Sequence, residues 1–168
     1  MQLRQRLPIL GWAVVLAFGC VVGLASQTAS PLNGTWKLNL AKSKYSPANL
    51  APKSSATKIV VSAAGIHLTN DSVDSQGRAT HTDYTATFDG KDHPWKGTID
   101  GKPNTDQDAI AWKKIDDRTF EVTNKLKGQV VSTQRIVVAQ DGKSRTNTVT
   151  GKNAQGQMLN HTVVYDKQ

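Results

Sequence analysis

The chain contains almost no cysteine, and its acidic residues are nearly all of one kind. Cys20 is the only cysteine in 168 residues, so no intrachain disulfide can form. Twelve of the 13 acidic residues are aspartate, many beside Gly or Asn, and this composition is typical of turns rather than helices. A protein without disulfides must be held together by its own apolar core.

Long apolar runs are also missing, except at the N-terminus. Arg4 and Arg6 precede an apolar stretch over residues 7–25 that closes with the small residues Gly23 and Ala25. This order is typical of a secretory signal peptide. We therefore predict a signal helix over residues 1–25 and a secreted or periplasmic product.

Two alternatives to simple cleavage remain. The apolar stretch is long enough to stay in the bilayer as an anchor. The tetrapeptide Ala17-Phe18-Gly19-Cys20 resembles the end of a lipoprotein signal, which would leave the protein anchored by a lipid at Cys20. If cleavage follows Ala25, no membrane span is expected beyond it.

Motifs for catalysis, metals and cofactors are absent as well. The four histidines have no pair at metal-ligand spacing: His67, His81, His93 and His161. No nucleophile elbow, phosphate-binding loop or dinucleotide fingerprint occurs. We predict a protein that is not an enzyme, with no cofactor or metal.

The net charge is +8, and the basic residues are not clustered in one part of the sequence. The lysines are spread along the chain, with one adjacent pair at Lys113-Lys114, which favours a solvated surface. The tryptophan at 112 alternates with apolar residues and is expected in the core, so no nucleic-acid partner is predicted. A basic surface that binds anionic partners stays open as an alternative.

What the sequence does contain is a series of short alternating stretches separated by turns. Residues 26–33 read as a short linker, and residues 34–168 as a single domain. Ala41 to Ser55 reads as a loop with two prolines, and Asp89-Gly90 as a hairpin turn. We expect strands at 34–40, 57–62, 66–69, 79–88, 93–99, 110–112, 120–126, 129–139, 143–150 and 158–165. These predict an all-β, antiparallel up-and-down β-barrel of about 8–10 strands.

Short motifs add a family resemblance. Gly34-Thr35-Trp36 and Val163-Val164-Tyr165 resemble the opening and closing strands of lipocalins and fatty-acid-binding proteins. The order of motifs is similar to that of exported bacterial lipocalin-like (calycin-type) proteins, most of them uncharacterised. The resemblance implies a calycin barrel that binds a small hydrophobic molecule. Val163 replaces the arginine with which fatty-acid-binding proteins hold the ligand carboxylate, and the proline-containing loop is a poor match for their helix pair.

The candidate barrel lining follows from the expected strand faces. The aromatic candidates are Trp36, Tyr84, Phe88, Trp95, Trp112, Phe120 and Tyr165, and the polar candidates are Arg135 and His161. The aromatics either line a pocket or fill the lumen. Arg135 either meets a ligand carboxylate, packs over Trp36 or lies exposed at the mouth.

These features predict an exported, monomeric barrel that binds a small hydrophobic or amphipathic ligand non-covalently. The alternative is a filled barrel that acts as an envelope interaction or scaffold protein and binds anionic partners through its basic surface.

Overall fold

The computed structural model describes residues 29–153 and 155–168. The predicted signal helix and the lipid anchor at Cys20 lie outside these residues. Within the described ranges, no helix has the length and apolar character needed to cross a membrane.

All of the strands belong to one antiparallel sheet, in the order β5-β8-β9-β10-β11-β12-β1-β2-β3-β4-β6-β7. Their bounds are β1 Gly34–Leu38, β2 Ser54–Ser62, β3 Gly65–Val73, β4 Ala79–Ala86, β5 Asp89–Pro94, β6 Gly97–Ile99, β7 Lys102–Pro103, β8 Ala109–Lys114, β9 Thr119–Leu126, β10 Gln129–Val138, β11 Ser144–Lys152 and β12 Met158–Lys167. Two short 3₁₀ turns, Leu40–Lys42 and Ala48–Leu50, are the helical segments of the described chain.

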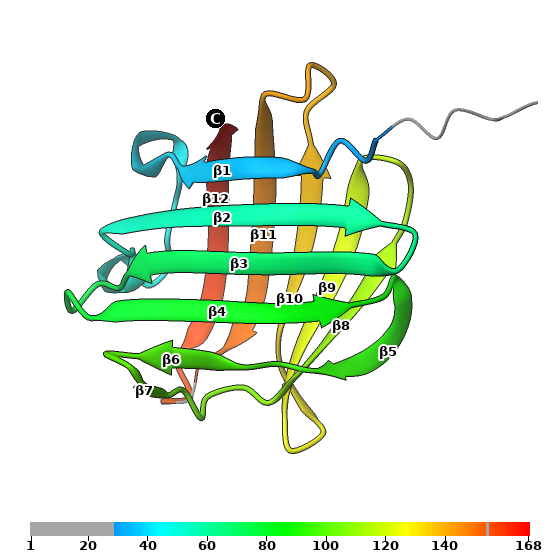
Figure 1. Ribbon diagram of the computed structural model, residues 1–168. Helices are drawn as coiled ribbons and strands as arrows, with labels where there is room; N and C mark the ends of the chain where they lie inside the picture. Colours follow the sequence, from blue (N-terminus) through cyan, green and yellow to red (C-terminus); the bar gives the residue numbers. More distant parts are fainter. Residues whose placement is uncertain (1–28, 154) are drawn as a thin grey trace, which may run out of the picture.

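The sheet curls into a barrel because the continuous segment from β5 to β6 pairs with strands from both sides of the sheet. β5 pairs with β8, the chain continues through Trp95 and Lys96, and β6 then pairs with β4. The Trp95 amide donates to the Asp108 carbonyl at 2.9 Å, and the Asp83 amide to the Lys96 carbonyl at 3.4 Å. β12 joins β11 to β1. Figure 1 shows the result as two crossing layers, β1 to β4 with β6 in front and β8 to β12 behind.

The predicted all-β antiparallel class is confirmed, and the sheet is curled as a barrel requires. The strand expected at 93–99 is divided into β5 and β6, because its two halves pair with different neighbours. The two-residue strand β7 lies in an expected loop. These differences turn about ten expected strands into twelve within the described residues.

The expected end of one strand and one expected turn are placed differently. β3 continues through Asn70 and Ser72 to Val73, although this stretch is polar. The side chain of Asn70 accepts from Ser55 and Thr57, and Ser72 bonds Thr80, so the polarity belongs to sheet contacts and not to a turn. Asp89-Gly90 opens β5 rather than forming a hairpin turn.

The core follows the alternation of the strands. In β2 buried and exposed residues alternate, as expected for a sheet with one wet face. The largest fully buried side chains are Trp36, Trp112, Phe120, Leu32, Ile59, Ile66, Ile136, Val122 and Val138. Burial of each contributes about 1.5–3 kcal/mol relative to exposure.

The G-x-W strand closes one end of the barrel. Trp36 is fully buried, and its indole nitrogen donates to the Leu32 carbonyl at 2.9 Å. Gly34 has a φ of 130°, and a Cβ there would lie 2.6 Å from Lys167 Cε. Leu32 is also fully buried and the side chain of Asn33 accepts from the Val61 amide. Two residues of the expected linker therefore take part in the barrel.

Candidate functional site

A buried arginine lies inside the barrel without an acidic partner. Arg145 of β11 is 3% exposed, and its guanidinium lies 4.3 Å from the ring centroid of Tyr165 and 5.4 Å from that of Trp36. In the described chain its Nε has no hydrogen-bond partner, and no ion pair involves it. Burial lowers the pKa of Arg145 to about 10, so the side chain remains charged at neutral pH.

Asn147 lies two residues further along the same face of β11. Its Nδ2 donates to Gln134 Oε1 at 3.4 Å, whereas its Oδ1 has no partner. Among the described residues, Asn147 Oδ1 and Arg145 Nε are the buried side-chain polar atoms left unbonded. Arg145 Nε is a hydrogen-bond donor and Asn147 Oδ1 is an acceptor. Leaving buried groups of this kind unpaired costs free energy.

Both residues line a cavity of about 180 Å³ inside the barrel. The other lining residues are Thr57, Leu68, Asn70, Thr82, Tyr84, Trp95, Gln107, Ile110, Trp112, Val122, Asn124, Gln134, Ile136 and Tyr165. The volume is below the 300–1,000 Å³ usual for drug-sized ligands. The cavity can therefore enclose a small molecule or one part of a larger one.

Several other polar groups of the cavity wall bond to one another. Gln107 Nε2 donates to Asn124 Oδ1 at 3.1 Å, and Asn124 Nδ2 donates to Ser132 Oγ at 2.9 Å. Trp112 Nε1 donates to the Tyr84 hydroxyl at 3.2 Å, and burial raises the pKa of Tyr84. Binding capacity is thus concentrated at Arg145 and Asn147.

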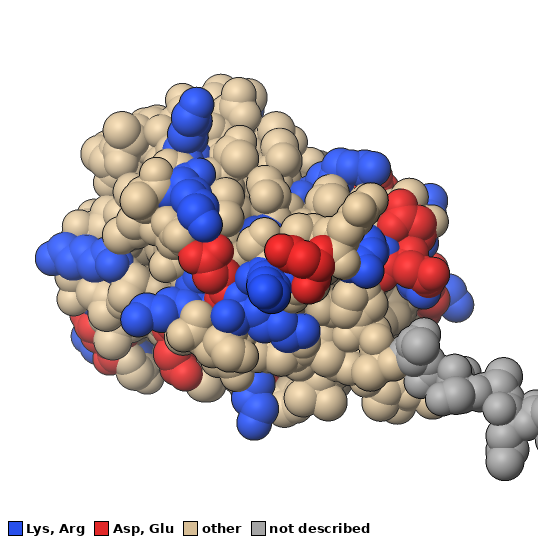
Figure 2. Space-filling model, turned by 90° about the horizontal axis from the view of Figure 1, so that it is seen from above, with Lys and Arg blue, Asp and Glu red and all other residues tan. Residues whose placement is uncertain are grey.

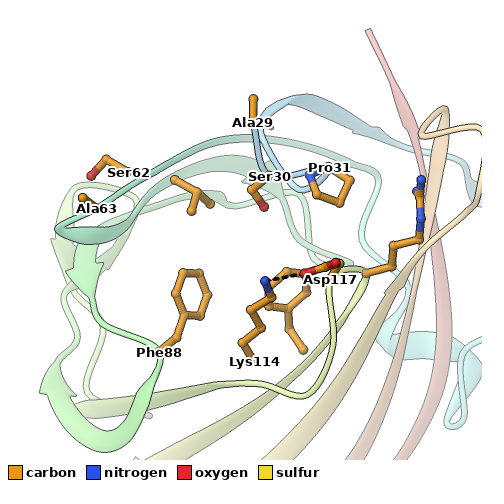
Figure 3. Close-up of a pocket in the computed structure, with 11 residues that line it drawn as sticks. Ala29, Ser30, Pro31, Ser62, Ala63, Phe88, Lys114 and Asp117 are labelled. Carbon is orange, nitrogen blue, oxygen red and sulfur yellow. Dashed lines mark hydrogen bonds and ion pairs between the residues drawn. The ribbon is translucent and has the colours of Figure 1, made fainter. Parts of the chain in front are cut away.

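A second hollow of about 800 Å³ lies at the closed end (Figure 3). Phe88 and Phe120 line it, and both pack on Trp112, with ring centroids 6.1 and 6.4 Å away. Lys114 there bonds Asp117 at 2.7 Å, and Arg118 Nη1 donates to the Ala139 carbonyl at 2.6 Å. The polar groups of this larger hollow therefore already have partners.

The predicted lining residues divide between these places. Tyr84, Trp95, Trp112 and Tyr165 line the inner cavity. Phe88 and Phe120 line the closed-end hollow. Trp36 lines neither space, and its ring centroid lies 5.4 Å from the Arg145 guanidinium.

Arg135 requires a correction, because it points outward. It is exposed and bonds Glu121 at 3.1 Å on the outer surface. The buried positions of β10 are Ser132, Ile136 and Val138, and Gln134 on the same face lines the cavity. The apolar alternation of Val131 and Val137 favoured the opposite face, because two inward positions of β10 are polar.

His161 is buried but does not line the cavity. It is 8% exposed, and its Nδ1 accepts from the Ser46 amide at 3.1 Å. Its ring lies 5.0 Å from that of Tyr45. Burial lowers the pKa of His161. Its contacts tie the loop between β1 and β2 to β12.

Sequence reasoning missed Arg145 and Asn147, because β11 reads as polar and threonine-rich. The register could have revealed them: Arg145 lies opposite Tyr165 and Asn147 opposite Val163. Opposed residues of neighbouring strands share a face, and Tyr165 was already expected inside.

Comparisons with known proteins include a likeness to a solved structure. No family model and no curated protein matches the chain. The fold is similar to a crystal structure of zebrafish ileal bile acid-binding protein complexed with cholic acid, with a TM-score of 0.46 and 13% identity over 83% of this chain and 100% of that one. In the described residues, no group of three or more His, Cys, Asp or Glu side chains could hold a metal ion.

Proposed function

We propose that this protein binds a small amphipathic molecule non-covalently inside its barrel, with Arg145 holding an anionic group of that molecule. The observation that carries the proposal is a charged guanidinium that is 3% exposed, has an unbonded Nε and lies in a cavity wall. A buried charge without an ionic partner is costly, and a bound carboxylate would compensate it.

The neighbouring side chain refines the chemistry of the ligand. Asn147 Oδ1 is free to accept a hydrogen bond, so a hydroxyl or amide donor close to the anionic group fits beside it. Trp112 and Ile136 supply apolar wall on the same cavity. Cation–π contacts with Trp36 and Tyr165 hold the guanidinium in place before a ligand arrives.

The test compares two probes that differ only in charge: decanoate and decanol, titrated by tryptophan fluorescence and calorimetry. We expect the wild type to bind decanoate more tightly than decanol. Arg145→Met should weaken decanoate binding about 10- to 100-fold, the size of a lost hydrogen bond to a charged group, and leave decanol unaffected.

Arg135→Met is the matched control, since Arg135 carries the same charge on the outer surface. It should bind both probes like the wild type. If neither probe binds, or if Arg145→Met binds decanoate with wild-type affinity, the proposed function is wrong.

The alternative of a scaffold that binds anionic polymers has less support. On the face seen in Figure 2, acidic side chains lie among the lysines and arginines, and no single basic patch forms. The cavity with its two unbonded polar atoms also has no role in a filled barrel.

Export is part of the proposal and is supported by the N-terminal sequence. Arg4, Arg6 and the apolar stretch that follows fit a signal peptide. N-terminal sequencing of protein from the extracytoplasmic fraction should begin at residue 26. A mature protein that starts at a lipidated Cys20 would replace the soluble route with the anchored one, and a chain that retains Arg4 in the cytoplasm would refute export.

A further inference from the structure

A third hollow adjoins the inner cavity from outside. It has a volume of about 490 Å³ and lies between the β6–β7 hairpin, the start of β8 and the turn after β9. We call it the outer groove. It is lined by Trp95, Lys96, Gly97, Thr98, Pro103, Asn104, Thr105, Gln107, Asp108, Leu126 and Lys127.

Trp95 and Gln107 line both the outer groove and the inner cavity. These two side chains therefore form the partition between the two spaces. Trp95 sits where the chain leaves β5 for β6, and its ring lies so close to Gly97 that a Cβ there would be 2.5 Å from Trp95 Cη2. The absence of a side chain at position 97 thus sets the place of the indole.

Three polar side chains of the outer groove, Asn104, Gln107 and Asp108, have hydrogen-bond partners, unlike Arg145 Nε and Asn147 Oδ1 of the cavity. Gln107 Nε2 donates to the Ala109 carbonyl and to Asn124 Oδ1. Asp108 Oδ2 accepts from the Lys127 amide at 2.8 Å, and Asn104 Oδ1 accepts from the Asp106 amide at 2.9 Å. What the groove offers to a ligand is the surface of Trp95, Pro103 and Leu126.

We infer that the ligand is longer than the inner cavity: its anionic head lies at Arg145, and its alkyl or ring-system tail passes Trp95 and Gln107 into the outer groove. This inference rests on the proposed function and deepens it. The cavity of about 180 Å³ is too small for a whole drug-sized ligand, whereas the two spaces together reach the usual range. The anionic head is assigned to the inner cavity because the two unbonded polar atoms, Arg145 Nε and Asn147 Oδ1, belong to residues that line it.

The test is a chain-length series of straight alkyl carboxylates, from hexanoate to tetradecanoate, titrated against the full protein below their micelle concentrations. We expect affinity to rise by up to about fourfold for each methylene that becomes buried. Leu126→Asp places a charge in the outer groove without touching the inner cavity. It should remove the gain of the long members and leave hexanoate affinity unchanged.

Val130→Asp is the matched control, because Val130 is an exposed apolar residue of the neighbouring strand outside the groove; it should retain the full length dependence. Gly97→Ala supplies an independent variant: the shifted Trp95 ring should alter affinity for tetradecanoate more than for hexanoate, together with the emission of the indole.

The outcomes separate the two proposals. If hexanoate binds through Arg145 but affinity does not increase with length, or increases equally in Leu126→Asp, the tail assignment is wrong and the binding function stands. If no carboxylate binds at any length, the proposed function fails and the tail assignment with it.

Discussion

The inner cavity and the closed-end hollow meet at one group of packed aromatic rings, and they differ in size and in their polar groups. The closed-end hollow of Figure 3 is larger, at about 800 Å³ against about 180 Å³, yet its charged groups are bonded to one another or to backbone. The inner cavity contains both of the unbonded buried atoms of the described chain. The proposed binding site therefore rests on unsatisfied polar groups rather than on volume.

The layer between the hollows provides the largest expected effect. Trp112 is 1% exposed, packs against Phe88 and Phe120, and donates to Tyr84. Trp112→Ala should lower the free energy of unfolding by about 3–5 kcal/mol, measured by urea denaturation. Phe88→Ala, at a partly buried position of the same layer, should cost less. Equal losses of stability in Trp112→Ala and Phe88→Ala would show that the burial of Trp112 and its hydrogen bond to Tyr84 add no stability to the layer.

The polar wall of the cavity gives the next effect. Asn124 joins Gln107 to Ser132 and is 6% exposed. Asn124→Ala leaves both partners without their bond, and should cost about 1–3 kcal/mol. Lys114→Ala at the closed end removes an exposed ion pair and should cost about 1 kcal/mol or less. A reversed order in thermal melts would contradict the view that the buried hydrogen bonds of Asn124 stabilise the barrel more than the exposed ion pair of Lys114.

The fold could be predicted from the sequence further than the site could, and particular residues show why. Alternation found most strands, because inward residues such as Ile59 and Phe120 are apolar. It failed in β10 and β11, where the inward residues Gln134, Arg145 and Asn147 are polar. The side chains that these three polar residues contact lie on other strands of the sheet. A pattern within one strand does not contain that information.

Arg145 could act as a binding group or as a structural contact over Trp36. The effect of Arg145→Met on the free energy of unfolding distinguishes the two roles. Because the guanidinium has no acidic partner among the described residues, Arg145→Met should leave the free energy of unfolding unchanged or raise it by about 1 kcal/mol. Arg118→Met, which loses the bond to the Ala139 carbonyl, should lower it by about 1 kcal/mol. A loss above about 2 kcal/mol in Arg145→Met would assign the arginine to closure of the barrel.

The smallest expected effect concerns pH and the loop at the other end from Trp36. Burial of His161 disfavours its protonated form, so the pKa of His161 is lower in the folded protein than the ordinary value of 6.5. Between the two pKa values the unfolded chain binds more protons, and stability therefore rises with pH. The contribution of His161 is complete above pH 6.5 and is lost as the pH falls below it. Protonation of Nδ1 would also remove the acceptor of the Ser46 amide.

His161→Gln keeps a hydrogen-bond acceptor but cannot titrate. Urea midpoints of the wild type and of this variant should therefore differ less at pH 5 than at pH 7.5, because only the wild type loses stability in that interval at this site. The window lies above the range in which Asp89 titrates, since backbone and side-chain hydrogen bonds lower the pKa of Asp89 to about 2. If the two proteins show the same pH dependence, His161 is not desolvated in solution, and the loop from Tyr45 to Ser46 does not cover β12 as the hydrogen bond from the Ser46 amide requires.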